Sequence, residues 1–397
     1  MTDLSLNALA AKSLDRGHPW VFREAVRGKA AMGEVVDLAV DGRFFARGIF
    51  DAASPIAVRV YTRDPKERVD RGLFSGRIER AWAKRDALFD DATTMMRIVN
   101  GEGDRLPAVV VDRYGSVAVV RLDGEAITAW TEDIVRAITP LAKKRGVETI
   151  LLRRSDAREG EAKIDRVHGP DPGGTIEVLE RGTRIEVDLV HGQKTGAFID
   201  QRENRRRVRA LVKPGGRALN LFSYTGGFSL AAALGAGAAS GSHGGGAREV
   251  VSVDVAAKAH ATAQRIFRLN GLDPTKHGFV TADATAHLAE LERRRETFDL
   301  VISDPPSFAP NERSKQRGLA AYAKLHKACA RVLAKGGVLC LASCSSHVTL
   351  EDFLGVADDR ALERSDLSVH GAWGPPEDHP TLAGFPEGRY LKFVVLR

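Results

Sequence analysis

The sequence has 397 residues, more than one ordinary hydrophobic core holds, so two or three domains are expected. Its 43% hydrophobic and 28% charged residues are typical of a globular protein, and no apolar run approaches the about 20 residues of a membrane helix. The 59 Lys and Arg against 52 Asp and Glu give a net charge of +7, which suits a nucleic-acid partner but also a basic enzyme without one.

Cysteine content and the first residues indicate the compartment. The three cysteines, Cys329, Cys340 and Cys344, show no metal-ligand spacing and are odd in number, so neither a metal site nor a disulfide framework is expected. Met1–Asn7 lacks the basic start and long apolar core of a secretory signal. Both observations predict a protein of the reducing cytoplasm, with no membrane partner.

Residues up to about Thr62 are predicted to form a small β-barrel. Turn signals separate the strand-like runs Glu34–Val40, Phe44–Arg47 and Ile56–Tyr61. Ahead of them, Arg16–Arg23 mixes basic and aromatic side chains, which can hold an RNA backbone and stack a base. His18, Trp20 and Arg23 are therefore candidate RNA-binding residues. The simpler alternative is that Trp20 and Phe22 fill the inside of the barrel.

A middle α+β segment follows. Periodicity predicts helices over Leu73–Leu88 and Glu125–Arg145, and strands over Ala108–Asp112, Val117–Leu122 and Thr149–Arg153. Glu177–Glu180 and Thr183–Leu189 are predicted to form a hairpin that leads into the last domain.

His191–Arg202 looks at first like the end of a phosphate-binding loop. The motif Gly-x-x-x-x-Gly-Lys-Thr lacks its first glycine here and has Gln193 in place of the second, so a nucleoside-triphosphate site is excluded. The segment still presents polar side chains that can wall a ligand site, namely Lys194, Thr195, Asp200 and Gln201. The helix predicted next, Arg202–Val212, carries five arginines that form either a solvated face or a face for phosphates.

Strands and helices then alternate, which predicts a mostly parallel sheet with helices on both faces and ligands at the carboxyl ends of its strands. Ala218–Ala231 is the clearest unit: an apolar strand, the glycine turn Ser223–Gly227, and a helix whose first amides point back at the turn. Gly235–Gly246 is predicted to be a flexible surface insertion. The other predicted strands are Glu249–Asp254, Gly278–Thr281, Phe298–Ser303, Val338–Cys344, Leu367–His370 and Tyr390–Leu396, and the helices are Ala256–Asn270, Ala284–Arg295, Gly318–Leu333 and Leu350–Leu362.

Acidic residues lie at or just after the ends of three of these strands: Asp254, Asp283 and Asp304, the last in Asp-Pro-Pro. A dinucleotide site would require Gly-x-Gly-x-x-Gly, which the pair Gly226-Gly227 does not supply. The glycine turn and the three acids, in this order, resemble the class I methyltransferases that use S-adenosylmethionine. In that pattern Asp254 binds the ribose, Asp283 the adenine amino group, and the turn the methionine end.

Cys344 and Asp304 stand at the ends of adjacent predicted strands and should face one pocket. Carbon 5 of a pyrimidine is a poor nucleophile, but attack of a thiolate at carbon 6 gives an enamine that accepts a methyl group. An accessible Cys344 thiolate can make this attack, and Asp304 can hydrogen-bond the cytosine edge. Cys340 and Cys329 are predicted to be packing residues, and burial as a small residue is also the alternative for Cys344.

Nearly the whole chain resembles the PUA-domain-containing class I methyltransferases that form 5-methylcytidine in large-subunit (23S) ribosomal RNA. The matching segments are His18–Phe22, Leu106-Pro107, Val111–Arg113, His191–Arg202, Asn220–Phe228, Ser252–Asp254, Asp304–Pro306, Ser343–Ser345, Asp378–Pro380, Pro386–Gly388 and Tyr390–Lys392. The resemblance implies a β-barrel PUA RNA-binding domain over residues 1–72, a middle α+β domain over 73–185, and an α/β, Rossmann-like methyltransferase domain with a mostly parallel seven-stranded sheet over 186–397.

The resemblance also implies the site: S-adenosylmethionine as cofactor, S-adenosylhomocysteine as product, no metal, and Cys344 as nucleophile with Asp304 beside it. The implied cofactor residues are Lys194, Thr195, Phe198, Asp200, Gln201, Asn220, Phe222, Ser223, Tyr224, Thr225, Gly226, Gly227, Asp254, Val255, Asp283, Ala284, Asp304 and Pro305. The implied partner is 23S ribosomal RNA or a ribosome assembly intermediate, and a homodimer stays open. We further expect Arg313, Lys315 and Arg317, in the polar loop after Phe308, to grip RNA near the site.

One position departs from the family pattern. Many RNA cytosine-C5 methyltransferases carry a second cysteine where Ser307 stands, so the base that removes the C5 proton is not identified.

Two alternative functions remain. An enzyme that methylates a base nitrogen would need Asp-Pro-Pro alone, although such enzymes usually place an aromatic residue directly after it, and here Ser307 precedes Phe308. The other alternative is a non-catalytic RNA-binding protein, against which the intact cofactor acids argue.

Overall fold

The computed structural model describes residues 2–154, 164–236 and 245–397, which form two compact units. Unit 1 consists of residues up to 180 with 185–199 and 377–388, and unit 2 of residues 181–184, 200–376 and 389–397. Most of the predicted glycine-rich insertion, residues 237–244, lies outside the described residues. Within the described parts, no helix is both long and apolar enough to cross a membrane. The division into three domains at residues 72 and 185 stays a prediction.

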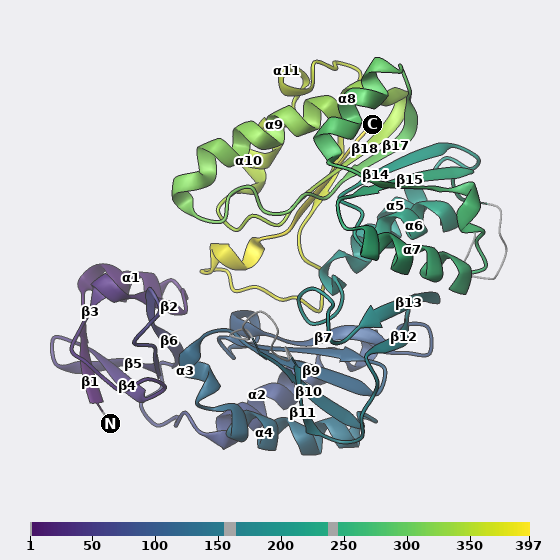
Figure 1. Ribbon diagram of the computed structural model, residues 1–397. Coiled ribbons are helices and arrows are strands. Elements are labelled where there is room, and N and C mark those ends of the chain that lie inside the picture. Colours follow the sequence, from purple (N-terminus) through teal and green to yellow (C-terminus); the bar gives the residue numbers. More distant parts are fainter. Residues whose placement is uncertain (1, 155–163, 237–244) are drawn as a thin grey trace. The chain divides into compact units, whose positions relative to one another are not determined.

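The first sheet of unit 1 has six strands in the order β2-β6-β5-β4-β1-β3, with β1 parallel to β4 and the other pairs antiparallel (Figure 1). Its core excludes the aromatic residues of β2, since Val21 is fully buried while Trp20 is half-buried and Phe22 is 39% exposed. The alternative that Trp20 and Phe22 fill the inside of this sheet is therefore wrong. The elements are β1 (Thr2–Leu6), α1 (Ala8–Asp15), β2 (Trp20–Phe22), β3 (Val26–Arg27), β4 (Val35–Val40), β5 (Arg43–Phe50) and β6 (Ile56–Thr62).

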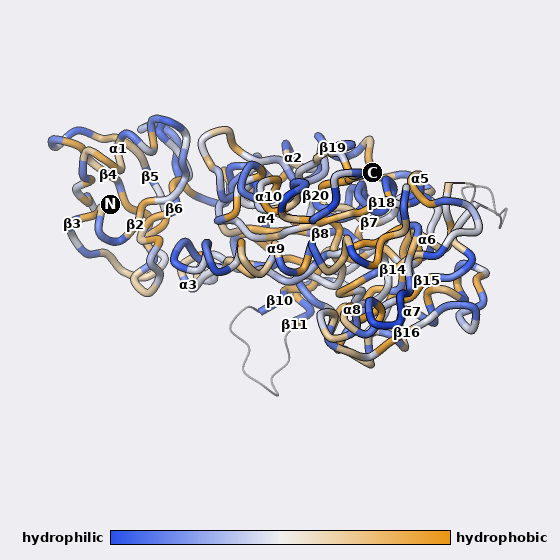
Figure 2. Tube along the Cα trace, turned by 90° about the horizontal axis from the view of Figure 1, so that it is seen from above, coloured by the Kyte–Doolittle hydropathy of each residue, from blue (hydrophilic) through white to orange (hydrophobic). Residues whose placement is uncertain are grey.

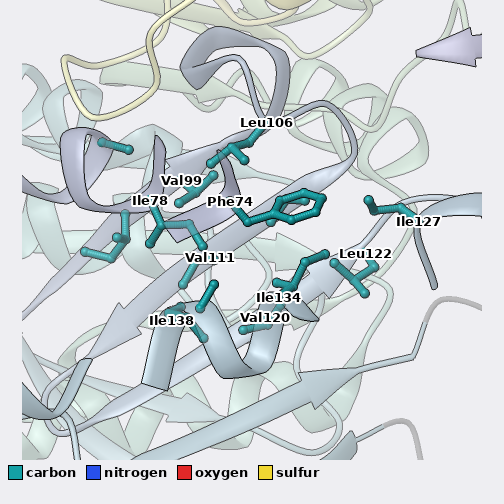
Figure 3. Packing of buried hydrophobic residues seen from close by; sticks show 14 of the residues in the cluster. Phe74, Ile78, Val99, Leu106, Val111, Val120, Leu122, Ile127, Ile134 and Ile138 are labelled. Carbon is teal, nitrogen blue, oxygen red and sulfur yellow. The ribbon is translucent and has the colours of Figure 1, made fainter. Parts of the chain in front are cut away.

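A second sheet of unit 1, in the order β11-β10-β9-β8-β7, packs against two helices. Figure 3 shows Phe74 and Ile78 from one helix and Ile134 and Ile138 from the other meeting apolar strand residues in this core. The elements are α2 (Arg71–Ala83), β7 (Met95–Asn100), β8 (Val109–Tyr114), β9 (Val117–Leu122), α3 (Glu125–Thr128), α4 (Thr131–Lys144), β10 (Thr149–Arg153) and β11 (Ile164–His168), with the separate hairpin β12 (Thr175–Glu180) and β13 (Thr183–Asp188).

The single helix predicted over Glu125–Arg145 is interrupted between α3 and α4. Trp130 lies at the break. Its indole N–H donates to the carbonyl of Gly33 at 2.9 Å, and its ring centroid lies 5.7 Å from that of Phe74. This tertiary contact, which local periodicity does not encode, explains why the helix stops and restarts there.

Unit 2 is a seven-stranded sheet in the order β16-β15-β14-β17-β18-β20-β19, parallel except for β20, which is antiparallel to both neighbours. Figure 1 shows α5, α6 and α7 against one face and α8, α9 and α10 against the other, and Figure 2 shows hydrophobic and hydrophilic colours alternating along the helices, as expected for helices with one buried side. The strands are β14 (Arg217–Leu221), β15 (Glu249–Asp254), β16 (Gly278–Thr281), β17 (Phe298–Ser303), β18 (Leu333–Ser343), β19 (Val369–Trp373) and β20 (Lys392–Leu396). The helices are α5 (Arg202–Leu211), α6 (Gly227–Leu234), α7 (Ala257–Leu269), α8 (Ala284–Arg293), α9 (Lys315–Arg331), α10 (Leu350–Gly355) and α11 (Asp359–Leu362).

Several element boundaries differ from the sequence prediction, among them those of α9, β18 and the helix predicted over Leu350–Leu362. α9 begins at Lys315, because Asn311 and Ser314 form a capping box that starts the helical turn early, so Lys315 and Arg317 lie in a helix and not in a loop. β18 begins at Leu333, and the predicted helix Leu350–Leu362 is split into α10 and α11.

The arginine face of α5 is not a solvated one throughout. Arg202 and Arg205 are 3% and 8% exposed, and Arg207 stacks on Trp373 at 4.6 Å. Neither predicted alternative, a solvated face or a phosphate-binding face, describes these three arginines, because their long side chains pack within unit 2.

Replacing Phe74 with Ala should lower the free energy of unfolding of unit 1 by about 3–5 kcal/mol, because a fully buried ring would leave a cavity. Urea unfolding followed by tryptophan fluorescence measures this, since Trp20, Trp82 and Trp130 all lie in unit 1. Leu9→Ala is the control at a residue that is 78% exposed. Equal effects of the two substitutions would contradict this account of the core.

Candidate functional site

The order of strands in unit 2 sets where a ligand can bind. Successive strands run outward from β14 to β15 and β16, and the chain then returns to the other side of β14 with β17. At such a switch point the loops after the two central strands separate and leave a crevice at their carboxyl ends. Leu221 at the end of β14 is level with both Val253 of β15 and Ser303 of β17, so the glycine turn, Asp254 and Asp304 follow at one edge.

The turn after β14 has a strained backbone. Phe222, Tyr224 and Gly226 have φ of 58°, 46° and 78°, in the left-handed region that costs non-glycine residues free energy. The Tyr224 amide donates to Asp254 Oδ2 at 2.8 Å, and the Ala256 amide donates to Asp254 Oδ1 at 2.8 Å. Asp254 thus holds the turn in place, and each of its oxygens keeps a lone pair for a ligand hydroxyl.

Buried polar contacts and close packing fix the same turn from behind. Asn220 is 1% exposed and donates its amide to Ser229 Oγ of α6 at 2.8 Å, while Ser252 Oγ of β15 donates to the same oxygen at 2.7 Å. A Cβ on Gly226 would lie 2.9 Å from Ala263 Cβ, so only glycine fits there. A direct contact between Asn220 and a cofactor stays a prediction.

His260 of α7 was not singled out from the sequence. His260 is 4% exposed. Its Nε2 lies 3.4 Å from Ser223 Oγ and its Nδ1 lies 3.4 Å from Thr281 Oγ1, so the ring joins the turn to the end of β16. Burial lowers the pKa of His260, and the nearby Asp254 opposes the shift only in part, so the ring is neutral at physiological pH. Helical position and residue type gave no signal for this role.

The predicted adenine-side residues follow β15 and β16. Val255 is 71% exposed directly after Asp254, an unusual exposure for valine that leaves an apolar surface at the site. Asp283 is exposed and caps α8, with Oδ1 accepting from the Ala286 amide at 2.9 Å, and Ala284 behind it is 4% exposed. One carboxylate oxygen of Asp283 is therefore used by the helix, and its contact with an adenine stays a prediction.

Asp304, at the end of β17, is held by the short helix η4 (Ile199–Gln201). Gln201 donates its amide to Asp304 Oδ2 at 3.0 Å and accepts from the Asn204 amide at 2.7 Å. Tyr390, to which the sequence analysis gave no role, donates its hydroxyl to Asp200 Oδ2 at 2.7 Å. Asp200 and Gln201 thus lie at the same edge as Asp304. The sequence suggested them only as polar side chains that can wall a ligand site, and the fold supplies their contacts.

Cys344 follows β18 and is the accessible cysteine of the three. Cys329 and Cys340 are both fully buried, which raises the pKa of each thiol, to about 12 for Cys329, whereas Cys344 is half-buried. The expectation that Cys329 and Cys340 are packing residues agrees with this burial. Only Cys344 among the cysteines can reach a bound substrate.

A chain of hydroxyls fixes the backbone around Cys344. Tyr322 of α9 contacts Ser343 Oγ and Ser345 Oγ at 2.9 Å each, and Ser345 Oγ lies 2.9 Å from Ser307 Oγ. The two serines that flank Cys344 are thereby tied to α9 and to the loop that follows Asp304. Ser307, where a second cysteine was considered, is part of this network.

Several predicted site residues lie in unit 1. Thr195 is fully buried, contacts Tyr114 OH at 2.9 Å and donates to Asp112, and the Lys194 ammonium lies 4.5 Å from the ring centroid of Phe198. Their place in the cofactor wall stays a prediction.

The N-terminal candidates for RNA binding are engaged within unit 1. His18 Nε2 lies 3.3 Å from a carboxylate oxygen of Glu387, and the Trp20 indole donates to Glu102 at 2.8 Å. Arg23 donates to the carbonyls of Asp51 and Ser54 and stacks on Phe50. Since two acids adjoin His18 and Trp20, these residues offer phosphate a weaker attraction than the sequence suggested.

The basic residues near Phe308 differ in exposure. Arg313 and Arg317 are exposed, whereas the Lys315 ammonium pairs with Asp352 at 2.7 Å, and this hydrogen bond raises the pKa of Lys315. Arg313 and Arg317 are therefore the stronger candidates for RNA contact. In the described parts of both units, no group of three or more His, Cys, Asp or Glu side chains is placed to hold a metal ion.

Comparison with known proteins gives matches over the full chain. A family model described as S-adenosylmethionine-dependent methyltransferase matches residues 125–382, and a PUA-like domain model matches residues 4–63. Ribosomal RNA large subunit methyltransferase I from Shewanella amazonensis is 37% identical over 397 residues, with 97% of this chain and 96% of the relative covered. The protein of the same name from Shigella boydii serotype 4 is 36% identical over 398 residues, covering 97% of this chain and 96% of that protein.

Two solved structures share the fold over 100% of both chains. A putative methyltransferase from Streptococcus mutans is 23% identical with a TM-score of 0.86, and a putative methyltransferase complexed with SAH is 24% identical with a TM-score of 0.87.

Asp254→Ala should weaken the binding of S-adenosylhomocysteine about tenfold or more, because the turn loses its anchor and a ligand hydroxyl loses a charged acceptor. Isothermal titration measures the change. Asp273→Ala is the matched control, since Asp273, like Asp254, accepts the backbone amide two residues on, but it precedes β16 and so lies at the opposite edge of the sheet. Unchanged affinity of the Asp254 variant would remove this residue from the cofactor site.

Proposed function

Since the chain belongs to the family of S-adenosylmethionine-dependent methyltransferases that carry a PUA-like domain, we propose that it methylates carbon 5 of a cytidine in large-subunit ribosomal RNA, with Cys344 as the nucleophile. The observation that carries the proposal is the accessible Cys344 at the carboxyl edge, one strand away from Asp304 and in the same sheet as the strained turn.

The fold and the cofactor are no longer open. The predicted Rossmann-like methyltransferase fold, the PUA-like domain and the use of S-adenosylmethionine are confirmed by the family matches and the sheet order. The chain's RNA substrate is supported by the PUA-like domain and by relatives named for large-subunit ribosomal RNA. A ribosome assembly intermediate as substrate, a homodimer and the cytoplasmic location stay predictions.

The residues of the crevice fit S-adenosylmethionine. Asp254 has acceptor capacity for the ribose hydroxyls, and the exposed Val255 beside it offers an apolar surface for the adenine ring. We assign the backbone of the glycine turn to the remaining, charged end of the molecule, which the absence of a side chain at Gly226 supports. When bound, S-adenosylmethionine supplies a methyl group on a sulfonium, which carbon 5 of an activated pyrimidine can take.

The chain's own residues activate the pyrimidine. The Cys344 thiolate attacks carbon 6, and the electron pair of the 5,6 double bond moves so that carbon 5 becomes nucleophilic. Asp304, held by Gln201, accepts a hydrogen bond from the exocyclic amino group of the cytosine and shares a proton with ring nitrogen 3, where negative charge develops as carbon 6 is attacked. After carbon 5 has taken the methyl group, its proton passes to solvent water, the electron pair of that C–H bond re-forms the 5,6 double bond, and the Cys344–carbon 6 bond breaks to return the thiolate.

Methylation of a base nitrogen is the second candidate, and the geometry favours it less. Such a site would need an aromatic ring beside Asp-Pro-Pro to stack the base. Phe308 instead packs against Tyr322, with ring centroids 4.8 Å apart, and so belongs to the core around α9.

Cys344→Ala should lower methyl transfer to ribosomal RNA by at least about 1000-fold, the order of loss when a covalent nucleophile is removed, and should keep S-adenosylhomocysteine binding. RNA with 5-fluorocytidine adds a direct readout, because fluorine at carbon 5 blocks the release of the adduct. The wild-type protein should then form a complex that survives denaturant, and the Cys344 variant should not. Cys340→Ala, within β18 and four residues before Cys344, is the matched control. Methyl transfer by the Cys344 variant would rule out the cysteine mechanism.

Neutralising Arg313 and Arg317 to Gln should weaken RNA binding and reduce the slope of log affinity against log salt by up to about 0.7–0.9 per lost phosphate contact. Adding Lys315→Gln should change little more, because its ammonium is paired with Asp352. Arg293→Gln with Arg294→Gln is the control, since both arginines pair with Glu290 on α8. Filter binding over a salt series gives the slopes. Equal slopes for wild type and the Arg313/Arg317 variant would place the RNA elsewhere.

A further inference from the structure

A buried lysine lies beside the loop that carries Cys344. Lys392, the first residue of β20, is directly opposite Ser343 of β18 and is 3% exposed. Its ammonium donates to the carbonyl of Ser345 at 2.5 Å and to the carbonyl of Tyr390 at 2.8 Å. The charge is therefore held between two backbone oxygens, one of which belongs to the residue after Cys344.

Such a position is costly without a negative partner, since burial of an ammonium removes its hydration. Burial lowers the pKa of Lys392 to about 8, and the charges of Cys344 and Asp352 oppose that shift, in that order. Asp352 is already paired with Lys315 at 2.7 Å. On the other side of Cys344, Tyr322 has a pKa raised by burial and, more weakly, by Cys344, so it stays neutral.

The nucleophile needs a cation, because the thiolate and not the thiol attacks. The usual alternative source, the N-terminus of a helix, is absent directly after Cys344, where the next helix, α10, begins only at Leu350. With a pKa of about 8, Lys392 is mostly protonated at neutral pH and can supply the positive charge.

We propose that Lys392 is a positioning residue that stabilises the Cys344 thiolate through the charge of its buried ammonium. This inference rests on the proposed function, because it gives the lysine a role toward the nucleophile. It also accounts for a lysine where β20 is otherwise apolar, in the run Lys392–Leu396.

The test is the pH dependence of Cys344 alkylation by iodoacetamide in the folded full-length protein, without RNA or cofactor. Because Cys329 and Cys340 are fully buried, the native reaction reports Cys344 alone. The midpoint of the wild-type rate profile should lie below that of the same protein unfolded in denaturant, near the ordinary value of about 8.5. A wild-type midpoint at or above the unfolded value would overturn the proposal, even if no Lys392 variant folds.

The variants separate charge from packing. Lys392→Met should raise the midpoint by about one unit and slow alkylation at neutral pH about tenfold, whereas Lys392→Arg should keep the wild-type midpoint. Lys324→Met, at an exposed position of α9, is the control. If Lys392→Met folds and keeps the wild-type midpoint, the lysine is only structural and the inference is wrong.

The two proposals fail separately. If Cys344→Ala keeps methyl transfer while Lys392→Met shifts the alkylation profile, the proposed function is wrong but the lysine–thiolate pair stands. If Cys344→Ala abolishes methyl transfer while the profile does not move, the function stands and the role of Lys392 is rejected.

Discussion

The hydrogen bond from the Tyr224 amide to the Asp254 carboxylate holds the part of the fold on which the site depends. Phe222 and Tyr224 occupy left-handed backbone conformations, each of which costs on the order of 1–3 kcal/mol for a non-glycine residue. They persist because the ends of β14 and β15 are fixed in register and because Asp254 binds the turn directly. The carboxylate that we propose as the ribose acceptor therefore also maintains the shape of the neighbouring turn, and under this proposal cofactor binding and local stability are coupled at Asp254.

From that turn the carboxyl edge divides into two chemical halves. The β14–β15–β16 side presents Asp254, the exposed Val255 and Asp283 and is suited to the methyl donor. On the β17–β18 side, Asp304 is held by Gln201, and the residues that flank Cys344 are tied to Tyr322 and Ser307. The order of the strands places these halves next to each other, because β17 pairs with β14 and β18 pairs with β17. Under the proposed function, the methyl donor and the pyrimidine held by Cys344 meet over the middle of the sheet.

The sequence predicts well what is local and poorly what joins distant segments. The strand, glycine turn and helix at Ala218–Ala231 and the acids at the strand ends follow from short-range pattern, and unit 2 has them in that order. His260, Tyr390 and Lys392 have no local signature, because their roles arise only when α7 packs behind the turn and β20 pairs with β18. The start of α9 was missed because the capping box at Asn311 and Ser314 outweighs the polar character of the segment. The burial of Arg202 and Arg205 on α5 depends on tertiary packing, so the sequence alone suggested only a solvated or a phosphate-binding role for them.

The most direct test of the account follows the hydrogen that a cytosine-C5 methylation must displace. Large-subunit ribosomal RNA transcribed with cytidine tritiated at carbon 5 is incubated with the protein and S-adenosylmethionine, and tritium released to water is compared with methyl groups incorporated. The account predicts one tritium released for each methyl group, and no release with the Cys344→Ala variant. Methyl incorporation without tritium release would contradict it, because the methyl group would then be on a nitrogen or another atom.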